Sequence, residues 1–235
     1  MTQNEAKQLQ KLRQKKYRDA FGLFVAEGDK CIGELAGRFA MVSHYTLANS
    51  SAKDIERASS LSTPQGSIAV FRRPDYGTLP MCNQGTLYLA LDGIQDPGNL
   101  GTIIRTADWF GVRDIICSRE TADCFSPKVV QATMGGLARV RVHYTDLTSW
   151  LSAQQGCPIY GTLLDGKDMY SPEAIPERRT GIIVMGNEGN GLTQAVRRLV
   201  THSLRIPSFP LGEPTSESLN VAIATAVVLA EFRRK

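Results

Sequence analysis

The sequence predicts an α/β protein of two domains, a small one followed by a larger one built on a parallel sheet. Its 235 residues are enough for two such domains. Beyond Thr86, helical segments alternate with near-continuous apolar runs, which are typical of parallel strands buried on both faces. The stretch RRPDYGTLPMCNQG, rich in proline and glycine, separates this pattern from what precedes it. We therefore predict domains over residues 1–75 and 86–235, joined by a linker over 76–85.

The first domain is predicted to mix short helices and strands. A helix near the N-terminus leads into a strand around Phe24, and a second helix covers residues 28–38. An apolar strand follows at residues 39–42. The segment SAKDIERASSL is predicted as a helix with Ser51 as its cap, and residues 66–71 as a strand.

In the second domain, six strand segments alternate with five helical segments. The last helix is apolar all round from Val221 to Ala230, so it must be covered on several sides. Dimerisation and simple core packing would each provide that cover. The strands are predicted at residues 87–91, 112–116, 138–143, 159–163, 181–185 and 204–206, and the helices at 99–110, 128–134, 146–155, 193–199 and 216–234.

Basic side chains are concentrated at the N-terminus. The net charge is only +4, but the first eighteen residues hold six lysines and arginines against one acid, Glu5. A polyanion such as RNA would explain this clustering, and so would the solvated face of an ordinary amphipathic helix. Both alternatives stay open for this segment alone. The six residues are Lys7, Lys11, Arg13, Lys15, Lys16 and Arg18.

Membrane, secretory and metal-binding classes find no support in the sequence. No apolar stretch reaches the roughly 18 residues that span a membrane, and the N-terminal segment lacks the apolar core of a secretory signal. The cysteines show neither a C-x-x-C pair nor metal-ligand spacing with the histidines. We therefore expect free thiols in a reducing cytoplasm and no metal. The five cysteines are Cys31, Cys82, Cys117, Cys124 and Cys157.

The segment DPGNLGTIIRTADWFG follows the predicted strand that ends at Leu91. Its Asp-Pro-Gly turn leads into a helix for which Asn99 is a reasonable cap. Arg105 lies off the apolar stripe of this helix, and two helical residues six apart would point about 240° apart. We therefore expect Asn99 to act from the loop. Arg105 is well placed either to hold a phosphate or ribose oxygen or to form a surface pair with Asp108.

Two further segments place small and amide side chains at strand ends. In MGNEGNGL, glycines let the backbone approach a ligand closely, although plain turn chemistry, with Glu188 as a helix-start carboxylate, is the alternative. The segment is neither a dinucleotide fingerprint nor a P-loop. In SESLNVAIA, Ser218 and Asn220 can orient a hydroxyl at the start of the last helix. Ser216 could be no more than its N-cap, and no hydrolase motif accompanies these segments.

Together and in this order, the three segments resemble the three motifs of the SpoU (TrmH) family of RNA ribose 2′-O-methyltransferases. The resemblance implies a C-terminal domain of the SPOUT superfamily with a deep trefoil knot. The segments KKYRDAFGLFVAEGDKCIGEL and TPQGSIAVF are similar to the L30e-like RNA-binding extension of many members. S-adenosylmethionine as cofactor, RNA as substrate and a homodimer are likewise implied, and the extension favours 23S ribosomal RNA over tRNA. A non-catalytic RNA-binding homologue and a base methyltransferase are the rival interpretations.

The resemblance also assigns roles to residues. No metal is required for the direct methyl transfer that it implies. The segment Ser208–Glu217 departs from the family pattern, because it is longer than the usual linker between the Ile-Pro and Ser-Leu-Asn elements. The catalytic positions fall on Asn99, Arg105, Glu188, Ser218 and Asn220, and the cofactor-binding positions on Thr162, Leu163, Gly186, Ile206 and Leu219.

Overall fold

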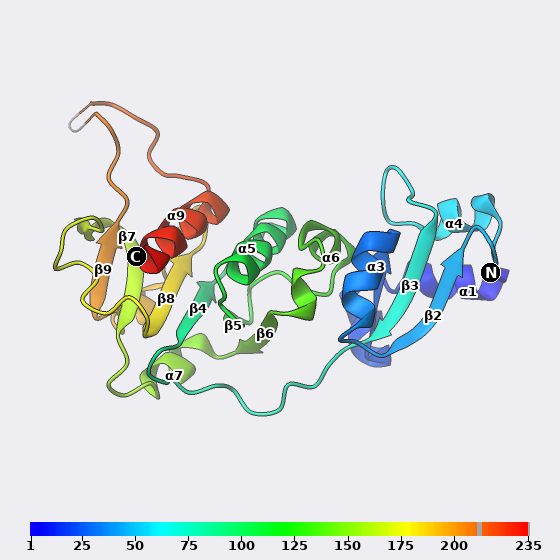
Figure 1. Ribbon diagram of the computed structural model, residues 1–235, viewed down its shortest axis with the longest axis horizontal. Helices are drawn as coiled ribbons and strands as arrows, with labels where there is room; N and C mark the ends of the chain where they lie inside the picture. Colours follow the sequence, from blue (N-terminus) through cyan, green and yellow to red (C-terminus); the bar gives the residue numbers. More distant parts are fainter. Residues whose placement is uncertain (211–212, 235) are drawn as a thin grey trace. The chain divides into compact units, whose positions relative to one another are not determined.

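The computed structural model describes residues 1–210 and 213–234 (Figure 1). The chain forms two compact units, Met1–Gly77 with Asp123–Arg139, and Thr78–Ala122 with the chain from Val140 onward. These units differ from the predicted domains, because residues 123–139 fall in the first unit and residues 78–85 of the predicted linker fall in the second. Leu211 and Gly212, within the long 208–217 segment, lie outside the described residues, as does Lys235.

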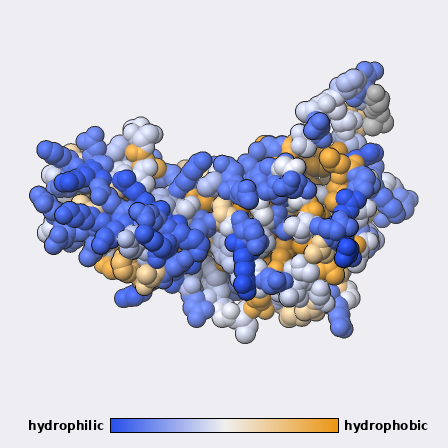
Figure 2. Space-filling model, turned by 180° about the vertical axis from the view of Figure 1, so that it is seen from behind, coloured by the Kyte–Doolittle hydropathy of each residue, from blue (hydrophilic) through white to orange (hydrophobic). Residues whose placement is uncertain are grey.

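The first unit is built on a three-stranded antiparallel sheet in the order β1-β3-β2. Its surface is mostly hydrophilic on the side shown in Figure 2. Ser51 caps α4, as predicted, by accepting a hydrogen bond from the Asp54 backbone amide. The elements are α1 (Gln3–Lys11), α2 (Lys15–Phe21), β1 (Leu23–Glu27), α3 (Asp29–Ala36), β2 (Met41–Thr46), α4 (Ala52–Ala58) and β3 (Ser67–Arg72).

A later segment of the chain completes the first unit. It contains α6 (Pro127–Ala132) and the 3₁₀ helix η1 (Gly136–Ala138), and α6 packs against β1. Arg18 is buried and donates from Nε and Nη2 to Asp123 at 2.9 and 2.7 Å. The rings of Phe24 and Phe125 pack with their centroids 4.8 Å apart. An ion pair and a ring contact therefore fasten the start of this segment to the first unit.

The second unit is built on a six-stranded sheet in the order β6-β5-β4-β8-β7-β9. Every pairing is parallel, which confirms the predicted sheet type. All six residues of β4 are buried, as its apolar run predicts. The elements are β4 (Leu87–Asp92), α5 (Pro97–Trp109), β5 (Asp114–Ser118), β6 (Arg141–Thr145), α7 (Leu147–Ser152), β7 (Ile159–Asp168), β8 (Gly181–Gly186), α8 (Gln194–Arg197), β9 (His202–Arg205) and α9 (Val221–Arg233).

Helices cover both faces of this sheet. Tyr88 and Ala90 of β4 pack in one apolar cluster with Trp150 of α7 and Val196 of α8. Because side chains alternate along a strand, Leu89 faces the other way. Helices α5 and α9 pack side by side, and α9 also contacts β8 (Figure 1). The core of this unit is therefore a buried sheet between two helical layers.

Several predicted boundaries are wrong, among them the end of β7, predicted at residue 163, and both ends of β2, predicted at residues 39–42. The strand expected from residue 112 begins at Asp114, and the one expected from residue 138 begins at Arg141, because η1 occupies the residues before it. The last helix begins at Val221 instead of residue 216, because Asn220 is its N-cap. Ser216 therefore does not cap this helix.

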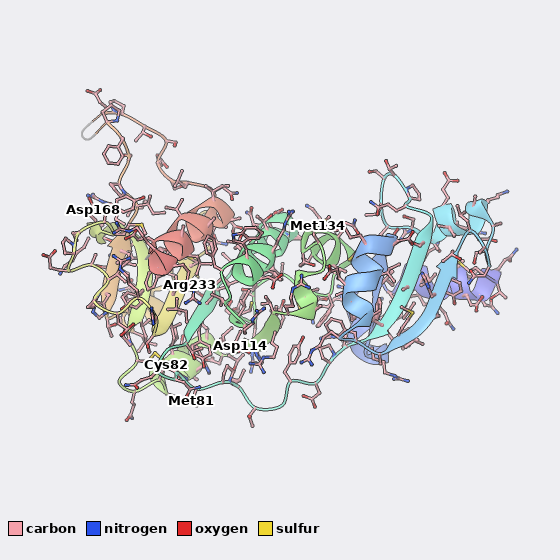
Figure 3. The ribbon with its side chains drawn as sticks, viewed as in Figure 1. Met81, Cys82, Asp114, Met134, Asp168 and Arg233 are labelled. Atoms are coloured by element: carbon pink, nitrogen blue, oxygen red, sulfur yellow. A yellow bond between two sulfur atoms is a disulfide. The ribbon has the colours of Figure 1, made fainter. Side chains whose placement is uncertain are left out.

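The cysteine prediction is wrong for one pair. Cys82 and Cys157 form a disulfide with a Cα–Cα distance of 6.1 Å, whereas Cys31, Cys117 and Cys124 are buried thiols outside this bond. The paired residues are 75 positions apart, in the stretches before β4 and β7 (Figure 3). Parallel strands begin at the same edge of the sheet, so the fold brings together two thiols that sequence spacing cannot pair. Among the described residues, no helix is long and apolar enough to cross a membrane.

Candidate active site

The three motif segments follow strands β4, β8 and β9. In the sheet, β8 lies beside β4, and β7 separates β8 from β9. Because all these strands are parallel, their carboxyl ends lie at one edge, where open α/β sheets bind ligands. The candidate site therefore belongs to the second unit and is assembled from loops far apart in the sequence.

The first motif begins with a helix cap, and that cap is not Asn99. Asp96 accepts a hydrogen bond from the Asn99 backbone amide at 2.8 Å, and Pro97 is the first helical residue. Asn99 therefore lies in the first turn of α5, which corrects the prediction that it acts from the loop. Its side chain is left available for contacts outside the helix.

Arg105 lies further along α5 and is exposed. The local pair with Asp108 is not formed, and the Asp108 carboxylate accepts a hydrogen bond from Arg113 at 3.3 Å. Within the described part of the chain, the Arg105 guanidinium makes no hydrogen bond or ion pair. The structure therefore leaves its five N–H donors available to a ligand.

The second motif forms a loop that turns back on itself. Asn187 and Gly191 exchange two backbone hydrogen bonds of 2.9 Å. A Cβ on Gly186 would lie 2.4 Å from the Gly191 carbonyl carbon, so only glycine allows this closure. Glu188 sits exposed in the loop, and α8 begins only at Gln194 after its own cap, Thr193. Glu188 is therefore not a helix-start carboxylate.

A chain of side-chain hydrogen bonds joins the three motifs. Asn99 donates from Nδ2 to Glu188 Oε1 at 2.9 Å. Asn220 donates from Nδ2 to Asn99 Oδ1 at 2.9 Å. The Asn220 Oδ1 in turn accepts from the backbone amides of Ala222 and Ile223 at the start of α9. These bonds fix the orientation of both side-chain amides, Asn99 and Asn220. We call Glu188, Asn99 and Asn220 the amide network.

Two predicted site residues stand outside the amide network. Ser218 lies in the extended segment before α9, is exposed, and makes no hydrogen bond to any residue that the structure describes. Arg105 has no bond to the network either. The structure thus brings together three of the five predicted catalytic residues and places the other two on the same elements as network members.

Four of the five predicted cofactor residues lie on or directly after strands β7, β8 and β9. Thr162 is on β7 and donates to the Val184 carbonyl at 3.2 Å, Gly186 ends β8, and Ile206 follows β9. Leu219 precedes the α9 cap and is 49% exposed. Leu163 is half-buried and begins an interruption in the sheet.

This interruption frees backbone groups at the sheet edge. Leu204 of β9 pairs both with Thr162 and with Lys167, so residues 163–166 have no partner in the β7–β9 register. Gly166 returns so close that a Cβ there would meet the Leu204 backbone at 2.5 Å. Unpaired backbone groups with half-exposed apolar side chains suit a nucleoside, because such sites combine a mainly apolar lining with a few polar groups.

Two residues that sequence reasoning missed hold the second motif in place. Asn187 donates to the Gly93 carbonyl at 2.7 Å, and its Oδ1 accepts from the amides of Gly189 and Asn190. Asp92 is buried at the end of β4 and accepts from the Thr193 amide at 2.7 Å. A carboxylate ending the apolar run LYLALD was the available signal for Asp92.

Two family models match this chain, one over its C-terminal part and one over its N-terminal part. The model of the SpoU rRNA Methylase family matches residues 86–230. A model described as an MRM3-like substrate binding domain matches residues 3–60. The first match covers all three motif segments.

Individual relatives agree with the family match. The 23S rRNA (guanosine(2553)-2′-O)-methyltransferase RlmP of Bacillus subtilis is 33% identical over 173 residues, which are 73% of this chain and 66% of that protein. The mitochondrial rRNA methyltransferase 1 of Homo sapiens is 38% identical over 61% of this chain and 44% of its own length. The chain thus spans two thirds or less of these relatives.

Solved structures resemble the whole chain. A TrmH-family protein from Porphyromonas gingivalis has a TM-score of 0.87 and 40% identity, with 99% of this chain and 98% of that chain covered. An AdoMet-bound rRNA methyltransferase from Sinorhizobium meliloti has a TM-score of 0.84 and 32% identity, with coverage of 99% and 95%. Shared motifs, family match and fold together place this chain in the SpoU family of RNA methyltransferases.

Proposed function

We propose that this protein transfers a methyl group from S-adenosylmethionine to a ribose 2′-hydroxyl of ribosomal RNA. The observation that carries the proposal is the amide network, which ties three distant motifs into one site. Arg105 lies on the same helix as Asn99, about 240° further round its axis, and within the described residues it keeps its N–H donors free for RNA. The names of relatives support ribosomal RNA as the substrate class, since RlmP is a 23S rRNA 2′-O-methyltransferase. The AdoMet-bound relative supports the donor.

The donor would be held at the ends of β7, β8 and β9. S-adenosylmethionine supplies, when bound, a methyl group already attached to a good leaving group. Thr162 is the last residue paired with β9 before the interruption, and Leu163 is the first residue without a partner there. Ile206 and Leu219 offer apolar surface. Closure of the loop by Gly186 brings the backbone of the second motif to the same edge.

The protein's remaining task is to position the hydroxyl. A guanidinium has five N–H donors and no acceptor, so Arg105 engages the 2′-hydroxyl oxygen and a neighbouring phosphate rather than removing a proton. Transfer would form the O–CH3 bond, break the S–CH3 bond to release S-adenosylhomocysteine, and pass the hydroxyl proton to water. Glu188 and Asn220 fix the Asn99 amide, and the network offers a rigid polar wall for the ribose. Ser218 adds an exposed hydroxyl from the same segment as Asn220. Fixed orientation of reacting groups is itself a large part of such catalysis.

Finer features of the family complete the proposal. The first unit acts as an L30e-like RNA-binding domain, which the MRM3-like match over residues 3–60 supports. The C-terminal elements would form the trefoil knot that the family resemblance implies, and the contact of Asn220 with Asn99 after edge strand β9 supports this. Ile223 on α9 is 53% exposed and supports a homodimer through this helix. The enzyme acts in the cytoplasm, where its RNA substrate is found.

Tritium transfer from labelled S-adenosylmethionine tests the proposal. The full-length protein should label bulk ribosomal RNA and leave tRNA unlabelled, and the Arg105→Ala variant should label neither. Label in tRNA alone would move the substrate to the rival RNA class. RNA binding without any label would instead identify a non-catalytic homologue and overturn the proposal.

A further inference from the structure

The first unit has a groove that the proposed chemistry does not use. It has a volume of about 340 Å³ and lies between α1, α2 and the strands of the small sheet. Leu9, Leu12 and Val70 are buried and form its apolar floor. Phe21 and Val42 stand at its rim with 47% and 49% of their surface exposed. The volume is at the lower end of the range for small-molecule sites, about 300–1,000 Å³.

Aromatic rings and lysines gather beside this groove. The rings of Tyr17 and Phe21 stack with their centroids 5.9 Å apart. The Lys16 ammonium lies 4.9 Å from the Tyr17 centroid, and the Lys11 ammonium lies 5.8 Å from it. Lys11 also lines the groove. An aromatic edge flanked by cations is the arrangement with which proteins hold single-stranded nucleic acid.

The positive charges of Lys11 and Lys16 beside the groove are not paired with any acidic side chain that the structure describes. In the described chain, neither Lys11 nor Lys16 forms an ion pair, whereas the nearby Lys15 pairs with Asp19 at 2.7 Å. Glu5 is the acid that lines the groove, and its carboxylate accepts hydrogen bonds from the Thr2 amide and hydroxyl, at 2.6 and 2.9 Å. These bonds lower the Glu5 pKa and commit the carboxylate to the α1 cap.

We propose that this groove receives an unpaired base of single-stranded RNA, with Phe21 against the base and Lys11 and Lys16 at the flanking phosphates. Bases outside a duplex can be splayed onto aromatic side chains, whereas the bases of an A-form helix cannot reach such a groove. A second copy of the chain fits less well, because a two-fold contact would bring the same lysines face to face. The inference rests on the proposed function for the identity of the polyanion as RNA.

Binding of short RNAs to the full-length protein tests the groove. The probes are a fluorescent single-stranded oligouridine and a duplex of the same length, followed by anisotropy over a range of salt concentrations. Phe21→Ala should weaken single-strand binding about 5- to 100-fold, the range for loss of one base–aromatic stack. Lys11→Ala should lower the slope of log affinity against log salt by about 0.7. Both variants should change duplex binding far less.

Matched controls separate the groove from the general surface. Leu47 is 63% exposed in the same unit but does not line the groove, so Leu47→Ala should bind as wild type. Lys53→Ala removes an exposed lysine of α4 away from the groove and should leave single-strand affinity within about two-fold. Val42→Glu places an acid at the rim without shortening a side chain, and it should weaken binding as Phe21→Ala does.

The outcomes distinguish this inference from the proposed function. Unchanged single-strand affinity in both Phe21→Ala and Val42→Glu overturns the groove assignment, even if methyl transfer is normal. A change in sedimentation of these variants with unchanged RNA affinity also overturns it and assigns the groove to contacts between copies. Groove-dependent RNA binding by a protein that transfers no methyl group supports the groove and rejects the proposed function instead.

Discussion

Asn220 joins helix α9 to the candidate catalytic loops through a single amide group. Its side-chain oxygen accepts hydrogen bonds from the first backbone amides of the helix, and its side-chain nitrogen donates one to Asn99. The hydrogen bonds run from Asn220 through Asn99 to the Glu188 carboxylate, which accepts hydrogen bonds and cannot donate one when it is ionised. The two functions of Asn220, capping and orienting Asn99, can be separated by substitution.

Asn220→Asp should keep the cap and lose the network. The carboxylate still accepts from the helix amides, so the free energy of unfolding should stay within about 0.5 kcal/mol of wild type. It has no N–H for Asn99, so kcat for methyl transfer should fall at least about ten-fold. Asn220→Ala should lose both, with destabilisation of about 0.5–2 kcal/mol. Wild-type kcat in Asn220→Asp would show that the network has no catalytic role.

At the scale of elements, the loop after β8 depends on one close approach. A Cβ at position 186 would overlap the backbone of Gly191 and Leu192, whereas a Cβ at position 189 would lie 3.6 Å from the Asn187 side chain. Gly186 therefore closes the loop, and Gly189 does not. The two positions form a matched pair within one motif.

Gly186→Ala should reopen the loop. The added methyl overlaps backbone, which cannot rotate away, so we expect destabilisation of about 1–3 kcal/mol and loss of S-adenosylmethionine binding by calorimetry. Gly189→Ala adds a methyl at ordinary contact distance and should bind the donor normally. Equal donor affinity in the two variants would contradict the assigned role of Gly186.

A buried carboxylate at the start of β5, Asp114, predicts pH dependence. Burial opposes ionisation of Asp114, which is labelled in Figure 3, but hydrogen bonds from His143 and Arg141 outweigh this effect and lower its pKa. Stability from a lowered carboxyl pKa is present above the unfolded value and is lost as the pH falls through about 4 towards the folded one. Asp114→Asn should therefore be less stable than wild type at pH 7, by about 1–3 kcal/mol.

Urea unfolding at two pH values measures this contribution. The difference between wild type and Asp114→Asn should shrink between pH 7 and pH 3. Asp165→Asn, which breaks an exposed pair with Arg197, should show a difference of at most about 1 kcal/mol at both values. A difference for Asp114→Asn that does not change with pH would contradict the pKa argument.

Most elements of the second unit were predictable because a parallel sheet buried on both faces leaves long apolar runs. The first residues of the helices were less predictable, because neighbouring residues can each serve as the N-cap. In DPGN, both Asp96 and Asn99 can cap a helix, and the proline after Asp96 favours the earlier start. The amide network itself could not be predicted from spacing, because its bonds join residues 89 and 121 positions apart. Only the family resemblance pointed to those residues.

At the scale of the whole molecule, the chain enters the first unit twice. Residues 123–139 belong there although strands on either side of them lie in the second unit. The pair of Arg18 with Asp123 fastens this segment, and side-chain exposure of 3% and 8% shows how deeply it is buried. Sequence patterns group a segment with its neighbours along the chain. They therefore predict neither the place of residues 123–139 in the first unit nor the Cys82–Cys157 disulfide.

Arg18→Met should weaken the attachment of residues 123–139 to the first unit. Removing one partner leaves Asp123 buried without its cation, which costs about 3–5 kcal/mol. Hydrogen exchange of residues 123–139 should accelerate together with that of β1, because both pack in the same unit. Lys15→Met breaks an exposed pair and should leave exchange unchanged. Unaltered protection of residues 123–139 in Arg18→Met would contradict the role given to this ion pair.

The central claim is that the site methylates a sugar hydroxyl beside Arg105. Mass analysis of nucleosides from ribosomal RNA treated with the full-length protein and S-adenosylmethionine tests it most directly. The account predicts one additional 2′-O-methylnucleoside, absent when Arg105→Ala replaces the wild type. A methyl group found on a base, or an unchanged yield with Arg105→Ala, would contradict it.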